Sequence, residues 1–179
     1  MRPAVFLDRD GVINPYVAHI HRVGEFPLLP GVGAAIRRLN DAGLWVFVVT
    51  NQGGVGLGYM DEKDVRSVHR WMRQRLTAEK ARIDAIRFCP HAPQSGCSCR
   101  KPAPGMLLDL MRAYPVDPEL SFIVGDRESD VEAGHRAGIR AVRIGDGPTR
   151  AEFRAPDLPA AVNLILTYHL VKREMKIKR

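Results

Sequence analysis

The segment Ala4-Val5-Phe6-Leu7-Asp8-Arg9-Asp10-Gly11 decides the fold, because a short apolar run ends there in two carboxylates and a glycine. Three later apolar runs have a similar length, and glycine or polar residues follow each of them, at residues 45–49, 121–124 and 141–144. Continuous apolar runs of this kind predict strands that are buried on both faces, as in a parallel sheet.

Helical patterns separate these runs, at residues 32–42, 60–78, 105–113 and 129–137. The second pattern follows Asp61, a residue type that caps helix N-termini, and its apolar residues recur at helical spacing, at Val65, Val68, Met72 and Leu76. Gly43 and Gly138 favour helix ends. The alternation predicts the α/β class, with a Rossmann-like parallel sheet, helices on both faces and ligands beyond the carboxyl ends of the strands.

The length of 179 residues and the 45% apolar composition fit one globular domain. We expect a single domain over residues 1–170, which contains a cysteine-rich loop at residues 89–99, and a basic C-terminal tail at residues 171–179. The helix expected from Met60 follows the second strand closely, so a large cap domain has no room there.

Charge and hydropathy limit the partners that we expect. The net charge is +7, and residues 172–179 carry +4 of it, so a solvated tail is favoured over a nucleic-acid footprint. No apolar run approaches the roughly 18 to 20 residues that span a bilayer, and no signal-peptide core follows the N-terminus. We expect a cytoplasmic monomer that binds no nucleic acid and no membrane, and whose substrate is a small anion.

Polar residues at three strand ends carry the candidate chemistry. Strand alternation is expected to bring Asp8 and Asp10 to one side, and Asp126 to the same sheet edge, where carboxylates suit Mg²⁺. Thr50 and Asn51 begin a glycine-rich segment that is able to cradle a phosphate. Ordinary turn chemistry is the alternative for both motifs. For Asp130, a place in the first turn of a helix and a role beside the site are equally open.

All three cysteines and one histidine fall within eleven residues, as Cys89-Pro90-His91, five further residues, and Cys97-Ser98-Cys99. Three thiolates and one imidazole match a closed tetrahedral zinc site, which leaves no open position for a substrate. A loop with free buried cysteines is the alternative. We therefore predict structural Zn²⁺ on Cys89, His91, Cys97 and Cys99, which orders the loop before Arg100 and Lys101.

Asp8-Arg9-Asp10-Gly11, Thr50-Asn51, Lys101 and Gly125-Asp126 resemble, in order and spacing, the motifs of the haloacid dehalogenase superfamily of phosphatases. The resemblance implies that Asp8 is a nucleophile that forms an aspartyl-phosphate and that Asp10 is the general acid and then the base. It also implies that Thr50 and Lys101 hold phosphoryl oxygens. Mg²⁺ would be bound by Asp8, Asp126 and the backbone carbonyl of Asp10.

The zinc loop and Arg100-Lys101-Pro102-Ala103-Pro104-Gly105 narrow the resemblance to two families, the D,D-heptose 1,7-bisphosphate 7-phosphatases and the histidinol-phosphate phosphatases. Arg100 and Arg127 favour a sugar bisphosphate, and with Asn51 they are the expected substrate-binding residues. Histidinol phosphate or another small sugar phosphate is the alternative substrate. A zinc-stabilised phosphate-binding module is the non-enzymatic alternative, which paired carboxylates facing an anion argue against.

The sequence departs from the heptose enzymes at three places. Leu57 stands where they usually carry an arginine, and Arg127 stands where a lysine commonly follows the last aspartate. Residues 16–19, where that family contacts substrate, are also not its usual sequence. These departures affect the expected substrate and leave the expected chemistry unchanged.

Overall fold

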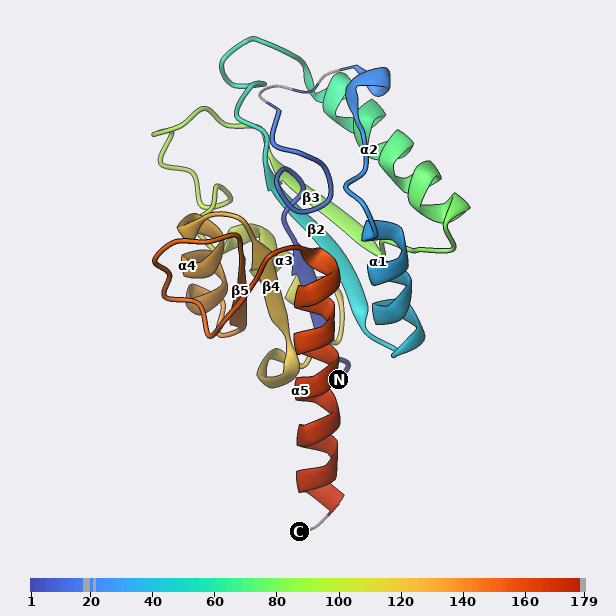
Figure 1. The fold of residues 1–179 in the computed structure, drawn as a ribbon. Coiled ribbons are helices and arrows are strands. Elements are labelled where there is room, and N and C mark those ends of the chain that lie inside the picture. Colours follow the sequence, from blue (N-terminus) through green and yellow to red (C-terminus); the bar gives the residue numbers. More distant parts are fainter. Residues whose placement is uncertain (18–19, 21, 178–179) are drawn as a thin grey trace.

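The structure is a computed structural model that describes residues 1–17, 20 and 22–177. One six-stranded parallel sheet organises it, with the order β3-β2-β1-β4-β5-β6 (Figure 1). The strands are β1 (Ala4–Leu7), β2 (Trp45–Asn51), β3 (Ala85–Cys89), β4 (Phe122–Gly125), β5 (Arg140–Ile144) and β6 (Phe153–Ala155). The predicted parallel α/β sheet is confirmed.

The central strand β1 pairs with β2 on one side and β4 on the other. Its last residue, Leu7, lies beside Val48 and Val124 in the paired register. The residues that follow these strands therefore leave the sheet at the same edge, which is why segments far apart in the sequence share one site.

Helices cover both faces of the sheet, as the sequence predicts. Alternate residues of β1 point to opposite faces, so Val5 and Leu7 pack into one core and Ala4 and Phe6 into the other. The first core receives side chains of α1 (Val32–Asp41), α2 (Glu62–Ala78) and α5 (Leu158–Ile177). The second core receives those of α3 (Gly105–Ala113) and α4 (Glu128–Arg136).

The connection from β2 to α2 is short. β2 ends at Asn51 and α2 begins at Glu62, so no cap domain lies between them. Asp61 caps the helix, because its side chain accepts a hydrogen bond from the backbone of Asp64 at 2.9 Å while Asp64 bonds back to the backbone of Asp61. The site consequently lies open at this end of the sheet.

The sequence did not predict β3, β6 or α5, and it placed the ends of most other elements within one or two residues. Two short 3₁₀ helices also occur, at Val23–Glu25 and Pro118–Leu120. Residues 171–177 of the expected tail continue α5, and residues 178–179 lie outside the described part of the chain. Among the described helices, none has the length and apolarity needed to cross a membrane.

Candidate active site and metal centres

A cavity of about 350 Å³ opens at the carboxyl edge of the sheet. Most of the residues singled out from the sequence line it together, namely Asp8, Asp10, Thr50, Asn51, Arg100, Lys101 and Arg127. Asp126 adjoins the cavity, since its carboxylate lies within 4.8 Å of those of Asp8 and Asp130. Tyr16 and Val17 also line the cavity, whereas residues 18 and 19 of the same loop lie outside the described residues.

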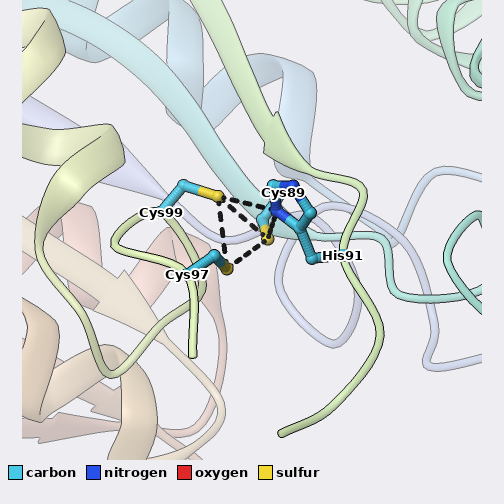
Figure 2. A group of neighbouring side chains, drawn as sticks. All are labelled: Cys89, His91, Cys97 and Cys99. Atoms are coloured by element: carbon cyan, nitrogen blue, oxygen red, sulfur yellow. Dashed lines mark hydrogen bonds between the residues drawn. The ribbon is translucent and has the colours of Figure 1, made fainter. Parts of the chain in front are cut away.

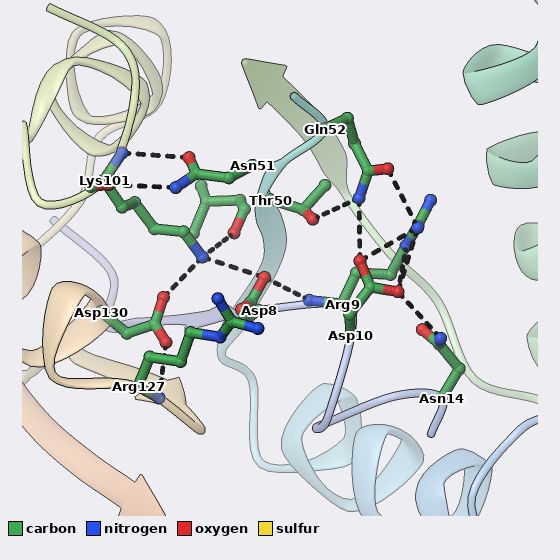
Figure 3. A network of polar contacts seen from close by, with 11 residues as sticks. Asp8, Arg9, Asp10, Asn14, Thr50, Asn51, Gln52, Lys101, Arg127 and Asp130 are labelled. Carbon is green, nitrogen blue, oxygen red and sulfur yellow. Dashed lines mark hydrogen bonds and ion pairs between the residues drawn. The ribbon is translucent and has the colours of Figure 1, made fainter. Parts of the chain in front are cut away.

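The ammonium group of Lys101 is at the centre of the polar network (Figure 3). Its Nζ lies 2.9 Å from Asp8 Oδ1 and 2.6 Å from Asp130 Oδ1, and it donates to the carbonyl of Val49 at 2.8 Å. An ammonium has three N–H donors, so these partners use all of them. Asp8 Oδ1 also accepts from the backbone N–H of Arg9 at 2.7 Å. The carboxylate of Asp8 is therefore fixed on one oxygen.

Burial and charge shift the titration of this cluster. Burial raises the pKa of Asp8 to about 6, although the neighbouring Lys101 opposes the rise. Burial would lower the pKa of Lys101, but the negative charges of Asp130 and Asp8 outweigh it, so that pKa is raised. The pKa of Asp126 is raised by burial and by the charge of Asp8. Three carboxylates thus face one ammonium, an excess of negative charge that a bound cation would relieve.

Asp126 carries a further sign of a cation site. Its Oδ1 is buried and has no hydrogen-bond partner among the described residues. Gly11 lies against the same side chain with φ of +83°, and a Cβ there would stand 2.4 Å from Asp126 Oδ2. Only glycine fits this close approach in the left-handed region. Carboxylate oxygens are ligands that Mg²⁺ prefers, so the donor set fits that ion.

Asp10 is positioned by a turn rather than by strand alternation, because β1 ends at Leu7. The backbone N–H groups of Ile13 and Asn14 donate to the carbonyl of Arg9, which closes the turn. Both carboxylate oxygens of Asp10 accept hydrogen bonds from the side chains of Arg9, Asn14 and Gln52 (Figure 3). Asp10 therefore shares the cavity with Asp8 but has its own set of partners.

Thr50 and Asn51 end β2 and face the cavity in different ways. Thr50 is buried, and its hydroxyl accepts from Gln52 Nε2 at 2.9 Å. The Asn51 amide bonds twice to the backbone of Lys101, donating to its carbonyl and accepting from its N–H, both at 3.0 Å. Asn51 thus fastens the segment carrying Lys101 to the end of β2. Its predicted contact with substrate stays a prediction.

The cysteine-rich loop folds its four candidate ligands together (Figure 2). The sulfurs of Cys89 and Cys99 lie 3.2 Å apart, and that of Cys97 lies 3.6 and 3.5 Å from them. Nδ1 of His91 lies 3.2 Å from the Cys99 sulfur and 3.5 Å from the Cys89 sulfur. Tetrahedral Zn–S bonds of about 2.3 Å place ligand sulfurs roughly 3.7 Å apart, so the cluster fits zinc.

Two arginines stand at the rim of the cavity. Arg100 donates to the carbonyl of His91 at 3.2 Å, which ties it to the cysteine-rich loop. The guanidinium of Arg127 lies 4.8 Å from the ring centre of Tyr16, within the range of a cation–π contact. Both arginines line the cavity, and their predicted contact with substrate stays a prediction.

The sequence reasoning missed four side chains of the Asp10 network: Arg9, Asn14, Gln52 and His69. His69 lies on α2 and its Nε2 is 3.3 Å from Arg9 Nη1. One signal could have found it, because position 69 falls four residues after Val65 and so belongs to the buried stripe of α2. A histidine in such a stripe needs a polar partner.

The chain is similar in sequence to known phosphatases. Residues 98–165 match the family described as HAD-hydrolase-like. A D-glycero-beta-D-manno-heptose-1,7-bisphosphate 7-phosphatase of Rhodopseudomonas palustris is 50% identical over 150 residues, which cover 80% of this chain and 83% of the relative. One of Haemophilus ducreyi is 35% identical over 88% of this chain and 92% of its own.

Solved structures of heptose 1,7-bisphosphate phosphatases also match this chain. The crystal structure of D,D-heptose 1,7-bisphosphate phosphatase from B. bronchiseptica, complexed with magnesium and phosphate, matches with a TM-score of 0.85 and 34% identity. The match covers 94% of this chain and 99% of that one. The corresponding enzyme from Burkholderia thailandensis matches with a TM-score of 0.69 and 33% identity over 92% of this chain and 99% of its own.

Proposed function

We infer that this chain removes the 7-phosphate of D-glycero-D-manno-heptose 1,7-bisphosphate. The chain belongs to the heptose 1,7-bisphosphate phosphatases of the haloacid dehalogenase superfamily. The observation that carries the inference is the cavity lined by Asp8 and Lys101, beside which the carboxylate of Asp126 lies within 4.8 Å of that of Asp8. A site built only to bind an anion would gain nothing from carboxylates that face it. The chain is thus a phosphoric monoester hydrolase rather than a binding module.

Mg²⁺ would be held by Asp8, Asp126 and the backbone carbonyl of Asp10, as the donor set and the magnesium of the B. bronchiseptica structure suggest. When bound, it supplies positive charge that offsets the charge of the phosphate. Its charge would also favour the ionised form of Asp8, whose pKa burial raises to about 6.

Asp8 acts as the nucleophile in this account. One oxygen of its carboxylate attacks the phosphorus of the 7-phosphate, and the bond between phosphorus and the sugar oxygen breaks. Asp10 gives its proton to that departing oxygen, so the sugar leaves as an alcohol. The phosphoryl group is then carried on Asp8 as an aspartyl-phosphate.

Hydrolysis of the aspartyl-phosphate returns the enzyme to its starting state. Asp10, now a carboxylate, takes a proton from water while the water oxygen attacks phosphorus. The Asp8 oxygen leaves, and orthophosphate is released. Thr50 and Lys101 hold the phosphoryl oxygens through both steps. The N–H of Lys101 that faces Asp8 would turn to the phosphoryl group, while Asp130 fixes the ammonium at 2.6 Å.

Arg100 and Arg127 would bind the 1-phosphate, which is not cleaved. Both stand at the cavity rim, where a guanidinium is able to form charge-assisted hydrogen bonds with a phosphate. Structural Zn²⁺ on Cys89, His91, Cys97 and Cys99 would hold the loop from which Arg100 and Lys101 project. Thiolate ligands need a reducing compartment, which is why we place the protein in the cytoplasm.

A phosphate-release assay with four substrates tests the proposed function. The alpha and beta anomers of heptose 1,7-bisphosphate, fructose 1,6-bisphosphate and histidinol phosphate are compared at equal concentration with saturating Mg²⁺. A heptose bisphosphate should give the highest kcat/KM, with the 1-phosphate retained in the product. A higher value for histidinol phosphate would assign the chain to that reaction instead.

A further inference from the structure

Arg9 is a buried cation that the reaction scheme above does not use. Its side chain is 1% exposed and lies beside Asp10, the residue assigned as general acid and base. Burying a guanidinium is costly unless its donors are satisfied, so its partners indicate what it does.

Three side chains hydrogen-bond to the Arg9 guanidinium, and the ring centre of Phe26 lies 5.7 Å from its central carbon. Nη2 lies 3.0 Å from each carboxylate oxygen of Asp10, and Nε donates to Oδ1 at 3.2 Å. Nη2 also donates to the amide oxygen of Gln52 at 3.1 Å, and Gln52 in turn donates to Asp10 Oδ2 at 2.9 Å. The third partner, His69 Nε2, lies 3.3 Å from Nη1 on the opposite side of the guanidinium.

We propose that His69 is a positioning residue for the reaction: through Arg9 it fixes the carboxylate of Asp10 in the orientation needed for proton transfer. His69 reaches the site from α2, a rigid helix, whereas Arg9 and Asp10 lie in a turn. An acceptor on the helix therefore gives the guanidinium a third hydrogen-bond partner, beside Asp10 and Gln52. The proposal rests on the proposed function only in giving Asp10 its role.

The chemistry of His69 suits an acceptor. Hydrogen bonding to Arg9, which has donors only, requires an imidazole without a proton on Nε2. Burial, together with the charges of Arg9, Arg73 and Arg66, lowers the pKa of His69 to about 3. The imidazole is neutral at any pH at which the enzyme would work, so protonation does not break its hydrogen bond with Arg9.

The Arg9 contact also stabilises the carboxylate that Asp10 becomes once it has given its proton. When Asp10 gives its proton to the departing sugar oxygen, a carboxylate is formed that already faces the donors of Arg9, Gln52 and Asn14. These donors are in place before charge develops, which is the arrangement that stabilises a transition state. If Arg9 tilted, some of these donors would no longer face Asp10.

The leaving group separates this positioning role from a purely structural one. The primary alcohol released from an alkyl phosphate needs a proton from Asp10, whereas p-nitrophenolate leaves without one. The measurement is the single-turnover rate of leaving-group release, by rapid quench, for heptose 1,7-bisphosphate and for p-nitrophenyl phosphate. His69→Leu removes the acceptor, and His69→Gln keeps one near the Nε2 position.

His69→Leu should lower the rate with heptose 1,7-bisphosphate about 10-fold or more relative to the rate with p-nitrophenyl phosphate. His69→Gln should keep the ratio of these two rates within roughly 3-fold of the wild-type ratio. Val68→Ala is the control, because Val68 is buried on the same helix and its removal costs packing alone. An unchanged ratio in His69→Leu would overturn the proposal. If that variant does not fold, His69→Asn, whose amide falls short of Arg9, replaces it under the same two criteria.

The same experiment keeps the two proposals apart. A wild type that cleaves p-nitrophenyl phosphate and fructose 1,6-bisphosphate but not the heptose bisphosphate contradicts the proposed substrate alone. Fructose 1,6-bisphosphate then serves as the alkyl ester, and the ratio still decides the role of His69. A wild type that cleaves none of them contradicts the proposed function and the role of His69 with it.

Discussion

Asp130 Oδ1 lies 2.6 Å from Lys101 Nζ, with both side chains almost completely buried. The other oxygen of Asp130 accepts from the backbone N–H of Arg127 at 3.0 Å, which caps the start of α4. Asp130 therefore lies in the first turn of a helix and also contacts the site, which are the two alternatives that the sequence left open. The ion pair fixes Lys101 without help from substrate, so the cation is in place before a phosphate arrives.

Gly11→Ala should weaken Mg²⁺ binding at the site and cost a modest part of the stability of the fold. The substitution places a methyl group 2.4 Å from Asp126 Oδ2 at φ of +83°, so the carboxylate must move. We expect a loss of about 1 to 3 kcal/mol in the free energy of unfolding and a higher Mg²⁺ concentration for half-maximal activity. Gly138→Ala is the matched control, with φ of +75° and open space around it. Equal magnesium curves for both variants would contradict this.

Arg100→Ala should impair cleavage of a sugar bisphosphate more than that of a monophosphate of similar size. Only the bisphosphate loses a charge-assisted contact, and about 10-fold in kcat/KM is a reasonable size for it. Arg100→Lys retains the charge and should recover part of the loss. The kcat/KM of each variant is measured with both substrates. An equal loss with the two would show that Arg100 does not hold the second phosphate.

Metal analysis should find one zinc per chain after purification without chelator. Cys97→Ser should lower the zinc content and reduce activity at saturating Mg²⁺, because the loop that carries Arg100 and Lys101 loses a ligand. Ser98→Ala, in the same loop, should keep both. Full activity of a zinc-free protein would remove the structural role that we assign to the metal.

The stability of the fold should depend on His69 in acid. The pKa of His69 is about 3 in the folded chain and near 6.5 when unfolded, so only the unfolded state takes up the proton between these values. The free energy of unfolding therefore falls as pH drops through this window, by about 2 kcal/mol at pH 5. His69→Gln should lose this component in urea titrations at pH 7 and pH 5. An unchanged difference between the two pH values would contradict the assignment.

The sequence predicted those parts of the molecule whose pattern is local. The four predicted strands are largely buried and read as mostly apolar runs, interrupted in β5 by the half-buried Arg143, and the candidate zinc ligands lie within eleven residues. β3 and β6 were missed because an edge strand is partly exposed and lacks such a run. α5 was missed because its apolar residues do not keep to one face, although Leu158, Ala161, Val162 and Ile165 are buried.

The partners within the site were less predictable, because they depend on tertiary distances. The parallel topology placed Asp8 and Asp126 at one edge, whereas Lys101 was placed by the family resemblance and the expected zinc loop. The sequence did not indicate that Arg9 turns inward, since an arginine beside an aspartate is usually solvated. Nor did it link His69 to Arg9, because their contact depends on how α2 packs against the turn after β1.

Trapping of the phosphorylated enzyme tests the central claim most directly. Borohydride reduces an acyl phosphate to an alcohol, so quenching the enzyme during turnover should convert Asp8 to homoserine in the peptide that contains it. Asp8→Asn should show no such product and a rate at least ~1,000-fold lower, while folding normally. Steady phosphate release by the wild type with Asp8 unmodified, or with homoserine at another aspartate, would contradict the account.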